Sequence, residues 1–345
     1  MKVLLVCADL GRTGGIQNYV KDIARAVESG NEIQIVELKG PGMPGKIIFA
    51  VEVFFRALFF HPDVVLCAHV NFSPLCHLIG SILGRKYVVF AYGIDAWNIT
   101  NNGQKAALRQ AEKIVAVSNF TASEIERQFP EFKPKITVIP GAVDADRFHI
   151  RPKPQYLIER YHVLGKKVIF TLARLSGAEG YKGYDKVIEA LPIIARSIPE
   201  VVYLIGGDGD DRSRIERLVK EKHLADRVII AGKIPDKELN DHYNLCDVFA
   251  MPSKGEGFGI VFLEALACGK PVVAGNRDGS RDAVLDGKLG TLVDPDNIND
   301  VADGIISALD SRAMSGDYLR KEVLGYYGLD GFGDKVRQLL HELQR

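Results

Sequence analysis

Two glutamates in one glycine-rich segment are the first candidates for chemistry. Residues 252–271 have the pattern of a strand end, a glycine loop and a helix, and they place Glu256 in the loop. Glu264 follows eight positions later, about two turns into the helix, among apolar neighbours. Because an unpaired carboxylate is costly to bury, Glu264 needs a hydrogen-bond partner. That partner is either a ligand hydroxyl or a group of the protein itself.

Two cations precede this segment in the chain. Arg174 follows the apolar run 168–172, and Lys182 lies just before a helix expected from about Tyr184. At the carboxyl end of a strand, both would stabilise the negative charge that develops on a phosphate leaving group. Considered alone, however, the two residues are better explained as solvated surface charges.

Glycine-rich turns follow two of the apolar runs. Gly14 and Gly15 come after the first run and open a helix, whose first amides suit a phosphate, although a turn that simply needs glycine explains them equally well. In residues 204–212, a turn followed by an Asp cap on the next helix is the favoured interpretation.

Twelve short apolar runs, separated by helical stretches, are interpreted as strands. They are residues 3–8, 33–38, 64–68, 87–91, 114–117 and 136–139, then 168–172, 201–205, 228–231, 248–251, 272–274 and 291–293. The stretches between them are long enough for crossover helices, so the pattern predicts parallel sheets. The alternation of apolar runs and helical stretches is interrupted over residues 141–165. The predicted fold class is therefore α/β, with two Rossmann-like, doubly wound parallel-sheet domains facing a cleft.

Length and composition limit the class of protein. We divide the 345 residues into domains over 1–150 and 151–314 and a helical segment over 315–345. Basic and acidic residues number 44 each, which disfavours a nucleic-acid-binding protein. The five cysteines include no C-x-x-C pair and are expected to be buried thiols in a reducing compartment. The apolar start of the chain is too short for a signal peptide, so we expect a cytoplasmic protein.

The longest apolar stretch, residues 47–60, contains Glu52 and Arg56 and is too short to cross a bilayer. A helix packed on a sheet is the favoured interpretation. Peripheral contact with lipid or a lipid-linked acceptor, through the first domain, stays as the alternative.

Together these segments resemble the retaining nucleotide-sugar glycosyltransferases of family 4. The E-x7-E motif of that family matches Glu256 and Glu264. The other matching segments, in the family's order over nearly the whole chain, are Gly14-Gly15, Arg174 with Lys182, residues 206–210 and residues 279–284. The resemblance implies the two-domain GT-B fold, no metal and no other cofactor, and a final helix over about 331–343 that crosses back to the first domain.

The resemblance also implies roles for single residues. Arg174 and Lys182 would hold the donor diphosphate, with Gly14 and Gly15 approaching from the first domain. Glu264 would bind the ribose hydroxyls. The remaining implied donor contacts are Glu256 with the backbone of Gly257, Phe258, Gly259 and Ile260 for the transferred sugar, and Lys233 and Ile234 beside the base.

One position departs from the family pattern, because Tyr92 lies where many members have a His. Tyr92 is a poor base near neutrality, with an ordinary pKa near 10. It could donate a hydrogen bond to the sugar, while Asp95 could orient an acceptor hydroxyl; packing alone explains a Tyr here equally well. His69, at the end of the third predicted strand, is an acceptor-side candidate, and a hydrogen-bonded core His is the alternative.

We therefore expect retaining transfer of a hexosyl group from a UDP- or GDP-sugar to a saccharide or lipid-linked acceptor, in polysaccharide or glycoconjugate synthesis. A catalytically weak nucleotide-sugar-binding protein of the same fold is the alternative. A nicotinamide oxidoreductase is disfavoured, because the first glycine loop lacks G-x-G-x-x-G spacing, although Glu37 would suit such a site.

Overall fold

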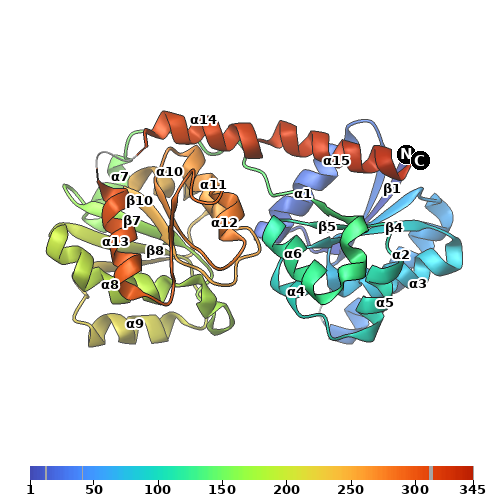
Figure 1. Ribbon diagram of the computed structural model, residues 1–345, viewed down its shortest axis with the longest axis horizontal. Helices are drawn as coiled ribbons and strands as arrows, with labels where there is room; N and C mark the ends of the chain where they lie inside the picture. Colours follow the sequence, from blue (N-terminus) through green and yellow to red (C-terminus); the bar gives the residue numbers. More distant parts are fainter. Residues whose placement is uncertain (12–13, 41, 311–313, 345) are drawn as a thin grey trace. The chain divides into compact units, whose positions relative to one another are not determined.

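The computed structural model describes residues 1–11, 14–40, 42–310 and 314–344 (Figure 1). The chain forms two compact units: Met1–Ala142 with Leu329–Arg345, and Val143–Gly328. Within the described residues each unit contains one six-stranded sheet, and all neighbouring strands of both sheets pair in parallel. The two doubly wound sheets predicted from the sequence are confirmed, and all twelve predicted strands are present.

The first sheet has the strand order β2-β1-β3-β4-β5-β6. Its strands are β1 (Lys2–Ala8), β2 (Glu32–Leu38), β3 (Val64–Cys67), β4 (Lys86–Ala91), β5 (Lys113–Ala116) and β6 (Ile136–Val138). Its helices are α1 (Gly15–Glu28), α2 (Gly42–Phe60), α3 (Ser73–Leu83), α4 (Ile94–Trp97), α5 (Asn102–Gln110), α6 (Asn119–Gln128) and α15 (Leu329–Leu343). Strands β1, β3 and β4 are buried along almost their whole length, which explains their continuous apolar sequences.

The second sheet has the order β12-β11-β10-β7-β8-β9. Its strands are β7 (Lys167–Leu172), β8 (Val201–Gly206), β9 (Val228–Gly232), β10 (Val248–Met251), β11 (Val272–Gly275) and β12 (Thr291–Val293). Its helices are α7 (Gln155–Tyr161), α8 (Tyr184–Ser197), α9 (Arg212–Glu221), α10 (Leu239–Leu245), α11 (Ile260–Ala267), α12 (Ser280–Ala283), α13 (Ile298–Leu309) and α14 (Gly316–Tyr327). Helices α8, α9 and α13 share one core cluster with this sheet.

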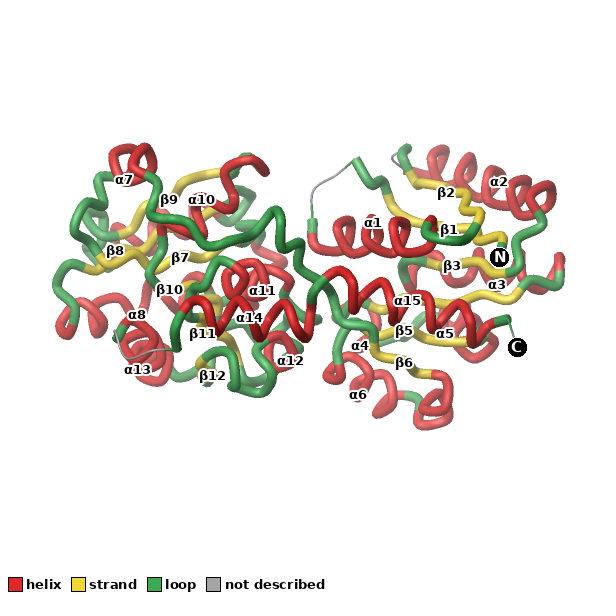
Figure 2. The backbone as a smooth tube through the Cα atoms, turned by 90° about the horizontal axis from the view of Figure 1, so that it is seen from above, coloured by secondary structure: helices red, strands yellow, loops and turns green. Residues whose placement is uncertain are grey.

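The two helices at the end of the chain belong to different units. We expected a helical segment over residues 315–345 that returns to the first domain; α14 lies in the second unit and α15 in the first, and residues 143–150 belong to the second unit. Right-handed crossovers place α1 on one face of the first sheet and the helices after β2 on the other. Helix α15 lies alongside α1 and so extends the cover of the face that α1 alone leaves open (Figure 2).

Aromatic packing holds α15 against the first unit. Phe332 of α15 meets the ring of Tyr19 in α1 edge-on, with 5.2 Å between ring centroids. Tyr19 is buried, and its hydroxyl donates to the Ile139 carbonyl at 2.8 Å. Near the other end of α15, Lys113 pairs with Glu342 at 3.5 Å. The helix is therefore part of the core of this unit.

The cysteines agree with the expectation from the sequence, since all five are free and buried. Within the described residues we find no helix that is both long and apolar enough to span a bilayer.

Removing the α15 anchor should destabilise the protein. Phe332→Ala deletes a ring that is only 4 % exposed, which typically costs about 3–5 kcal/mol, so we expect Tm to fall by at least about 6 °C. The control is Phe59→Ala in the same unit, where the ring is 75 % exposed and Tm should change by no more than about 1–2 °C. Equal Tm values for the two variants, measured by scanning calorimetry, would contradict the role given to α15.

Candidate functional site

The order of the second sheet creates a topological switch point between β7 and β10. From β7 the chain adds strands in one direction through β8 and β9, and it later adds strands in the other direction from β10. Helices leave the carboxyl ends of the two strands on opposite faces, which opens a crevice where ligands of such folds bind. Arg174 follows β7 and Glu256 follows β10, so both lie at this point.

An ion pair joins the two sides of the switch point. Lys182 Nζ lies 2.6 Å from Glu256 Oε1, and their side chains are only 17 % and 14 % exposed. Burial by itself opposes the charge on Lys182, but Glu256, Tyr181 and Glu179 outweigh burial and raise the pKa of Lys182 above its usual value. Lys182 is therefore a permanently charged group beside a carboxylate at the carboxyl edge.

A second carboxylate, Glu179, bridges the two cations. Its oxygens lie 3.0 Å from Arg174 Nη1 and 3.6 Å from Lys182 Nζ. The Arg174 side chain is 67 % exposed, so it is available to a ligand. We did not predict Glu179 from the sequence, although its position three residues before Lys182, in the turn ahead of α8, was a signal.

Close backbone packing keeps Lys182 at this place. Gly183, the residue between Lys182 and α8, has φ of +74°, and a Cβ atom there would collide with the Pro252 carbonyl. Only glycine permits this conformation and this approach. The chain segments that carry Lys182 and Glu256 are therefore in direct contact.

Asp278, which we also did not predict, organises the loop that carries Glu256. Its carboxylate is fully buried and accepts from the Glu256 amide at 2.7 Å, from Ser253 Oγ at 2.6 Å and from the Ser280 amide at 2.9 Å. Burial raises the pKa of Asp278, and these donors lower it in part. Its only visible signal was its place before Gly279, just after the strand at residues 272–274.

The glycine turn at residues 206–210 supports Arg174. Gly207 has φ of +130°, and a Cβ atom there would collide with the Ala173 carbonyl, so the turn packs directly on the Arg174 segment. Asp210 accepts from the Gly177 amide at 3.0 Å. The predicted turn is confirmed. The predicted Asp cap is wrong, because Asp211 makes no side-chain cap on α9 and instead pairs with Arg214 and Tyr184, each at 2.7 Å.

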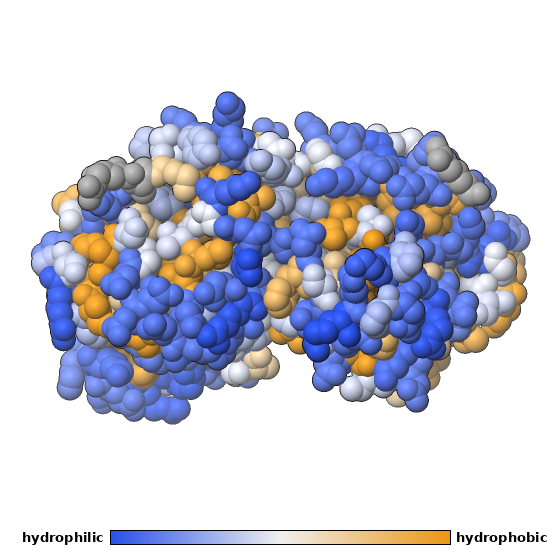
Figure 3. Space-filling model, in the orientation of Figure 1, coloured by the Kyte–Doolittle hydropathy of each residue, from blue (hydrophilic) through white to orange (hydrophobic). Residues whose placement is uncertain are grey.

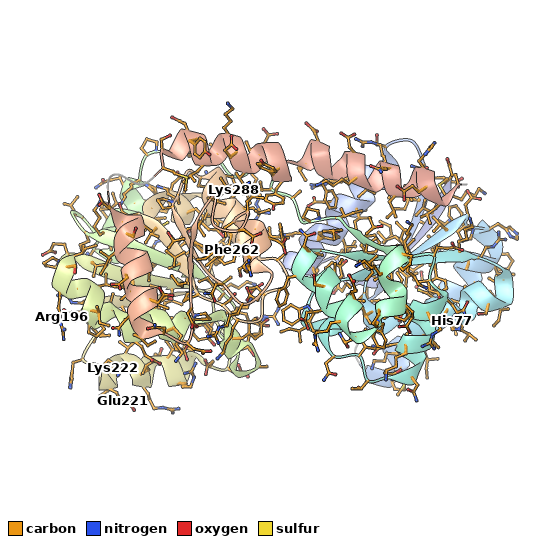
Figure 4. The ribbon with its side chains drawn as sticks, in the orientation of Figure 1. His77, Arg196, Glu221, Lys222, Phe262 and Lys288 are labelled. Carbon is orange, nitrogen blue, oxygen red and sulfur yellow. The ribbon has the colours of Figure 1, made fainter. Side chains whose placement is uncertain are left out.

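Glu264 lies on α11, where Tyr243 of α10 donates a hydrogen bond to Oε2 at 2.6 Å. The protein therefore supplies at least one of the partners that this carboxylate needs. Burial raises the pKa of Glu264 to about 7, although the Tyr243 hydroxyl acts in the opposite direction. Phe262, fully buried and labelled in Figure 4, holds α11 in the core by packing edge-on against Phe249.

The remaining donor candidates differ in exposure. The Phe258 ring is buried against Tyr327, with 5.3 Å between centroids, so only its backbone is suited to a ligand. Gly259 precedes α11 with φ of +89°, which leaves Ile260 as the first residue of the helix, and Gly257 lies earlier in the same loop. After β9, Lys233 is exposed while Ile234 is buried.

The first unit brings the acceptor-side candidates together. His69 follows β3, and its Nε2 lies 3.9 Å from Asp95 Oδ2. The Tyr92 ring lies between His69 and Tyr19, with centroid distances of 6.1 and 5.4 Å. Asp95 Oδ1 accepts from the Tyr92 amide at 3.0 Å.

Two polar atoms of this cluster are buried without a hydrogen-bond partner among the described residues: the Tyr92 hydroxyl and Asp95 Oδ2. Burial raises the pKa of both groups, so Tyr92 remains a donor. His69 Nδ1 accepts from the Asn71 amide at 3.1 Å, which puts the proton of a neutral His69 on Nε2, the nitrogen nearer Asp95. Three polar groups thus converge in one place.

The glycine loop after β1 is described only in part. Gly14 precedes α1 and Gly15 begins it, and the first turn of that helix has no acidic residue. Residues 12–13 lie outside the described part of the chain. Glu37 accepts from the Leu10 amide at 3.0 Å and so supports this loop.

Comparison with known proteins decides the family. The profile of Glycosyltransferase Family 4 matches residues 24–147, and that of Glycosyl transferases group 1 matches residues 158–322. The GDP-mannose-dependent alpha-(1-6)-phosphatidylinositol monomannoside mannosyltransferase of Mycolicibacterium smegmatis is 30% identical over 339 residues, covering 88% of each chain. The chain belongs to glycosyltransferase family 4.

This glycosyltransferase is similar to further proteins of the same kind. D-inositol 3-phosphate glycosyltransferase 2 of Catenulispora acidiphila is 28% identical over 257 residues, which cover 71% of this chain and 59% of that relative. The crystal structure of Anabaena HepE in complex with UDP and glucose superposes with a TM-score of 0.83 at 20% identity, covering 99% of this chain and 100% of the other. The fold of the glycosyltransferase is therefore GT-B, with two Rossmann-like sheets.

The raised pKa of Glu264 predicts a pH-dependent stability of the glycosyltransferase. The folded protein keeps this proton up to pH about 7, while the unfolded chain releases it near the ordinary value of 4.5. The folded state binds more protons between these values, so the free energy of unfolding falls as pH rises through that window. We expect the Tm of the wild type to fall relative to that of Glu264→Gln between pH 5 and pH 8. Parallel curves would contradict this assignment.

Proposed function

We propose that this family 4 enzyme transfers a hexosyl group from a GDP- or UDP-sugar to a saccharide or lipid-linked acceptor, with retention and without a metal ion. The Lys182–Glu256 pair beside Arg174, at the switch point of the second sheet, is the observation that supports this best. The M. smegmatis relative is named for GDP-mannose, and the HepE crystal structure contains UDP, so we propose both bases as candidates.

In this proposal the second unit holds the donor. Arg174 and Lys182 bind the diphosphate, and their positive charge takes the part that a metal ion has in other transferases. A diphosphate that reaches Lys182 competes with Glu179, which already offers a carboxylate to both cations. Glu256 and the loop that Asp278 supports bind the hydroxyls of the sugar, Glu264 binds the ribose, and Lys233 and Ile234 border the base.

Retention is proposed to follow a front-face route. The bond between the anomeric carbon and the diphosphate oxygen breaks while the acceptor oxygen attacks from the same face. The acceptor proton passes to the leaving diphosphate. Glu256 is poorly suited to be a nucleophile, because its carboxylate is already paired with Lys182. The cations instead stabilise charge that exists only as the glycosidic bond breaks, which lowers the barrier.

The first unit is proposed to hold the acceptor. Tyr92, Asp95 and His69 converge after β3 and β4, and two of their polar atoms lack partners among the described residues. A sugar hydroxyl between them would accept from Tyr92 and donate to Asp95. We also propose that the enzyme meets lipid-linked acceptors at a membrane surface through this unit.

Removing a donor cation should slow transfer. Arg174→Ala and Lys182→Ala each delete a charge-assisted contact to the leaving group, so we expect kcat to fall at least about tenfold with GDP-mannose or a UDP-hexose. Release of the nucleoside diphosphate measures the rate. Lys182→Ala also leaves Glu256 without this partner, so Tm is measured in parallel to detect a loss of stability. Arg174 is exposed, so Arg174→Ala tests the contact to the leaving group without removing the partner of Glu256.

The matched control is Lys222→Ala, an exposed cation next to the C-terminal end of α9 (Figure 4). Wild-type turnover in both site variants would overturn the donor assignment. Tight donor binding with no transfer to any acceptor would favour a nucleotide-sugar-binding protein instead.

Tyr92→Phe separates substrate contact from packing. Because the hydroxyl has no partner among the described residues, its loss should leave Tm unchanged or slightly raised. If the hydroxyl binds the sugar or the acceptor, kcat/KM should fall about five- to tenfold, equivalent to about 1–1.4 kcal/mol. Unchanged kcat/KM together with unchanged Tm would show that Tyr92 only packs.

A further inference from the structure

The proposed donor contacts leave Glu179 without a task, although it lies among them. Its carboxylate oxygens lie 3.0 Å from Arg174 Nη1 and 3.6 Å from Lys182 Nζ. A carboxylate and a phosphate present the same kind of acceptor oxygen to these two cations. A diphosphate bound to Arg174 and Lys182 would lie close to this carboxylate, and like charges at such a distance repel each other.

The carboxylates of this site are shielded from water. Hydrophilic residues cover much of the face of the second unit that Figure 3 shows, and ion pairs on such a surface are screened by solvent and salt. The side chains of Glu179, Lys182 and Glu256, in contrast, are only 21 %, 17 % and 14 % exposed. Repulsion between two anions is therefore weakly screened here, and a change of one charge at Glu179 should alter anion binding measurably.

Of the two carboxylates beside Lys182, Glu179 is the more easily displaced. Glu256 Oε1 lies 2.6 Å from Lys182 Nζ, and Asp278 holds the Glu256 amide at 2.7 Å. Glu179 lies farther from Lys182, and its shorter contact is to Arg174, whose side chain is 67 % exposed. Ion pairs with an exposed partner contribute little to stability. An incoming diphosphate would therefore displace Glu179 and leave the Lys182–Glu256 pair in place.

The turn that carries Glu179 permits this displacement without unfolding. Its backbone is held on both sides of Glu179, because the Gly177 amide donates to Asp210 at 3.0 Å and the Lys254 amide donates to the Tyr181 carbonyl at 2.9 Å. Among the described residues, the Glu179 carboxylate forms ion pairs only with the two cations. Rotation about its side-chain bonds is therefore enough to remove it from the site.

We propose that Glu179 is a displaceable counter-ion that lowers the affinity of the site for the nucleoside diphosphate product. The product carries a terminal phosphate, which ionises a second time at about pH 6, so its negative charge exceeds that of the donor. Glu179 therefore repels the product more strongly than the donor, and it returns to Arg174 and Lys182 as the product leaves. The inference deepens the proposed function and rests on it for the identity of the ligand.

The opposite role for Glu179 predicts an effect of the opposite sign. A carboxylate that orients the two cations for a ligand helps that ligand to bind, so its removal weakens binding. A counter-ion that competes with the ligand hinders binding, so its removal strengthens binding. Damage to the fold also weakens binding. The sign of the affinity change therefore separates a counter-ion from a residue with a structural or orienting role.

Calorimetric titration of the full chain tests the proposal with GDP, UDP and inorganic pyrophosphate. Glu179→Gln keeps the shape of the side chain and removes its charge, so we expect it to bind the nucleoside diphosphate at least about threefold more tightly than the wild type. Glu179→Ala should change the affinity in the same direction. Binding of guanosine or uridine should not change, because neither carries a phosphate.

The matched control is Glu189→Gln on α8, which removes a carboxylate paired with Lys186 at 3.2 Å. It should bind every ligand like the wild type. Initial-rate kinetics give a second readout. In Glu179→Gln the inhibition constant of the product should fall by a larger factor than KM for the donor, because the product carries the greater charge.

Unchanged or weaker binding of the nucleoside diphosphate by both Glu179 variants would overturn the proposal and leave the donor assignment standing. An equal gain for guanosine or uridine would also overturn it, since charge would not be the cause. If no nucleotide binds but pyrophosphate binds more tightly to Glu179→Gln than to the wild type, the donor assignment fails and the counter-ion role stands. No binding of any of these anions would overturn both.

Discussion

The second unit is organised around one electrostatic constraint: a largely buried lysine must keep its charge. Lys182 does so because Glu256 lies 2.6 Å away and Glu179 lies within 4 Å. Burial alone would favour the neutral amine, so these carboxylates maintain the cation in the absence of a ligand. An anion that binds here enters a site that is already charged and organised, which is the arrangement expected for stabilising a leaving group.

This ion pair depends on features of the fold outside the two charged side chains. The sheet order places the ends of β7 and β10 side by side. Gly183 lets one loop touch the other, and Asp278 holds the Glu256 amide in place. The turn at residues 206–210 packs behind Arg174 in the same way. The charged residues are few, and most of the structure around them serves to hold their backbone.

The first unit shows two solutions to the problem of covering a sheet. On one face α1 alone leaves part of the sheet open, and α15, from the end of the chain, packs beside α1 and extends the cover. On the other face α2 covers the sheet with one side and leaves an apolar side exposed. The resemblance to glycosyltransferase family 4 predicted the first arrangement, since it implied a final helix that returns to the first unit. The second is a property of this chain's own residues.

Much of the fold was determined by the sequence alone. Strands that are buried on both faces must be continuous apolar runs, so all twelve could be located, and long connections required parallel pairing. The residue types at Arg174, Lys182, Glu256 and Glu264 could also be read directly. Only the tertiary structure decided what each of them contacts, because Lys182 and Glu256 are 74 residues apart and meet through the sheet order.

The same reason explains what was missed. Glu179 and Asp278 were marked in the sequence only by their positions, and Tyr243 by nothing, since each gains its role from a partner brought close by folding. The apolar stretch at residues 47–60 was ambiguous for a different reason. A helix that is apolar all round does not reveal which side the rest of the chain will cover. The sequence thus determined which residues could do chemistry, and the packing of the folded chain decided which of them meet.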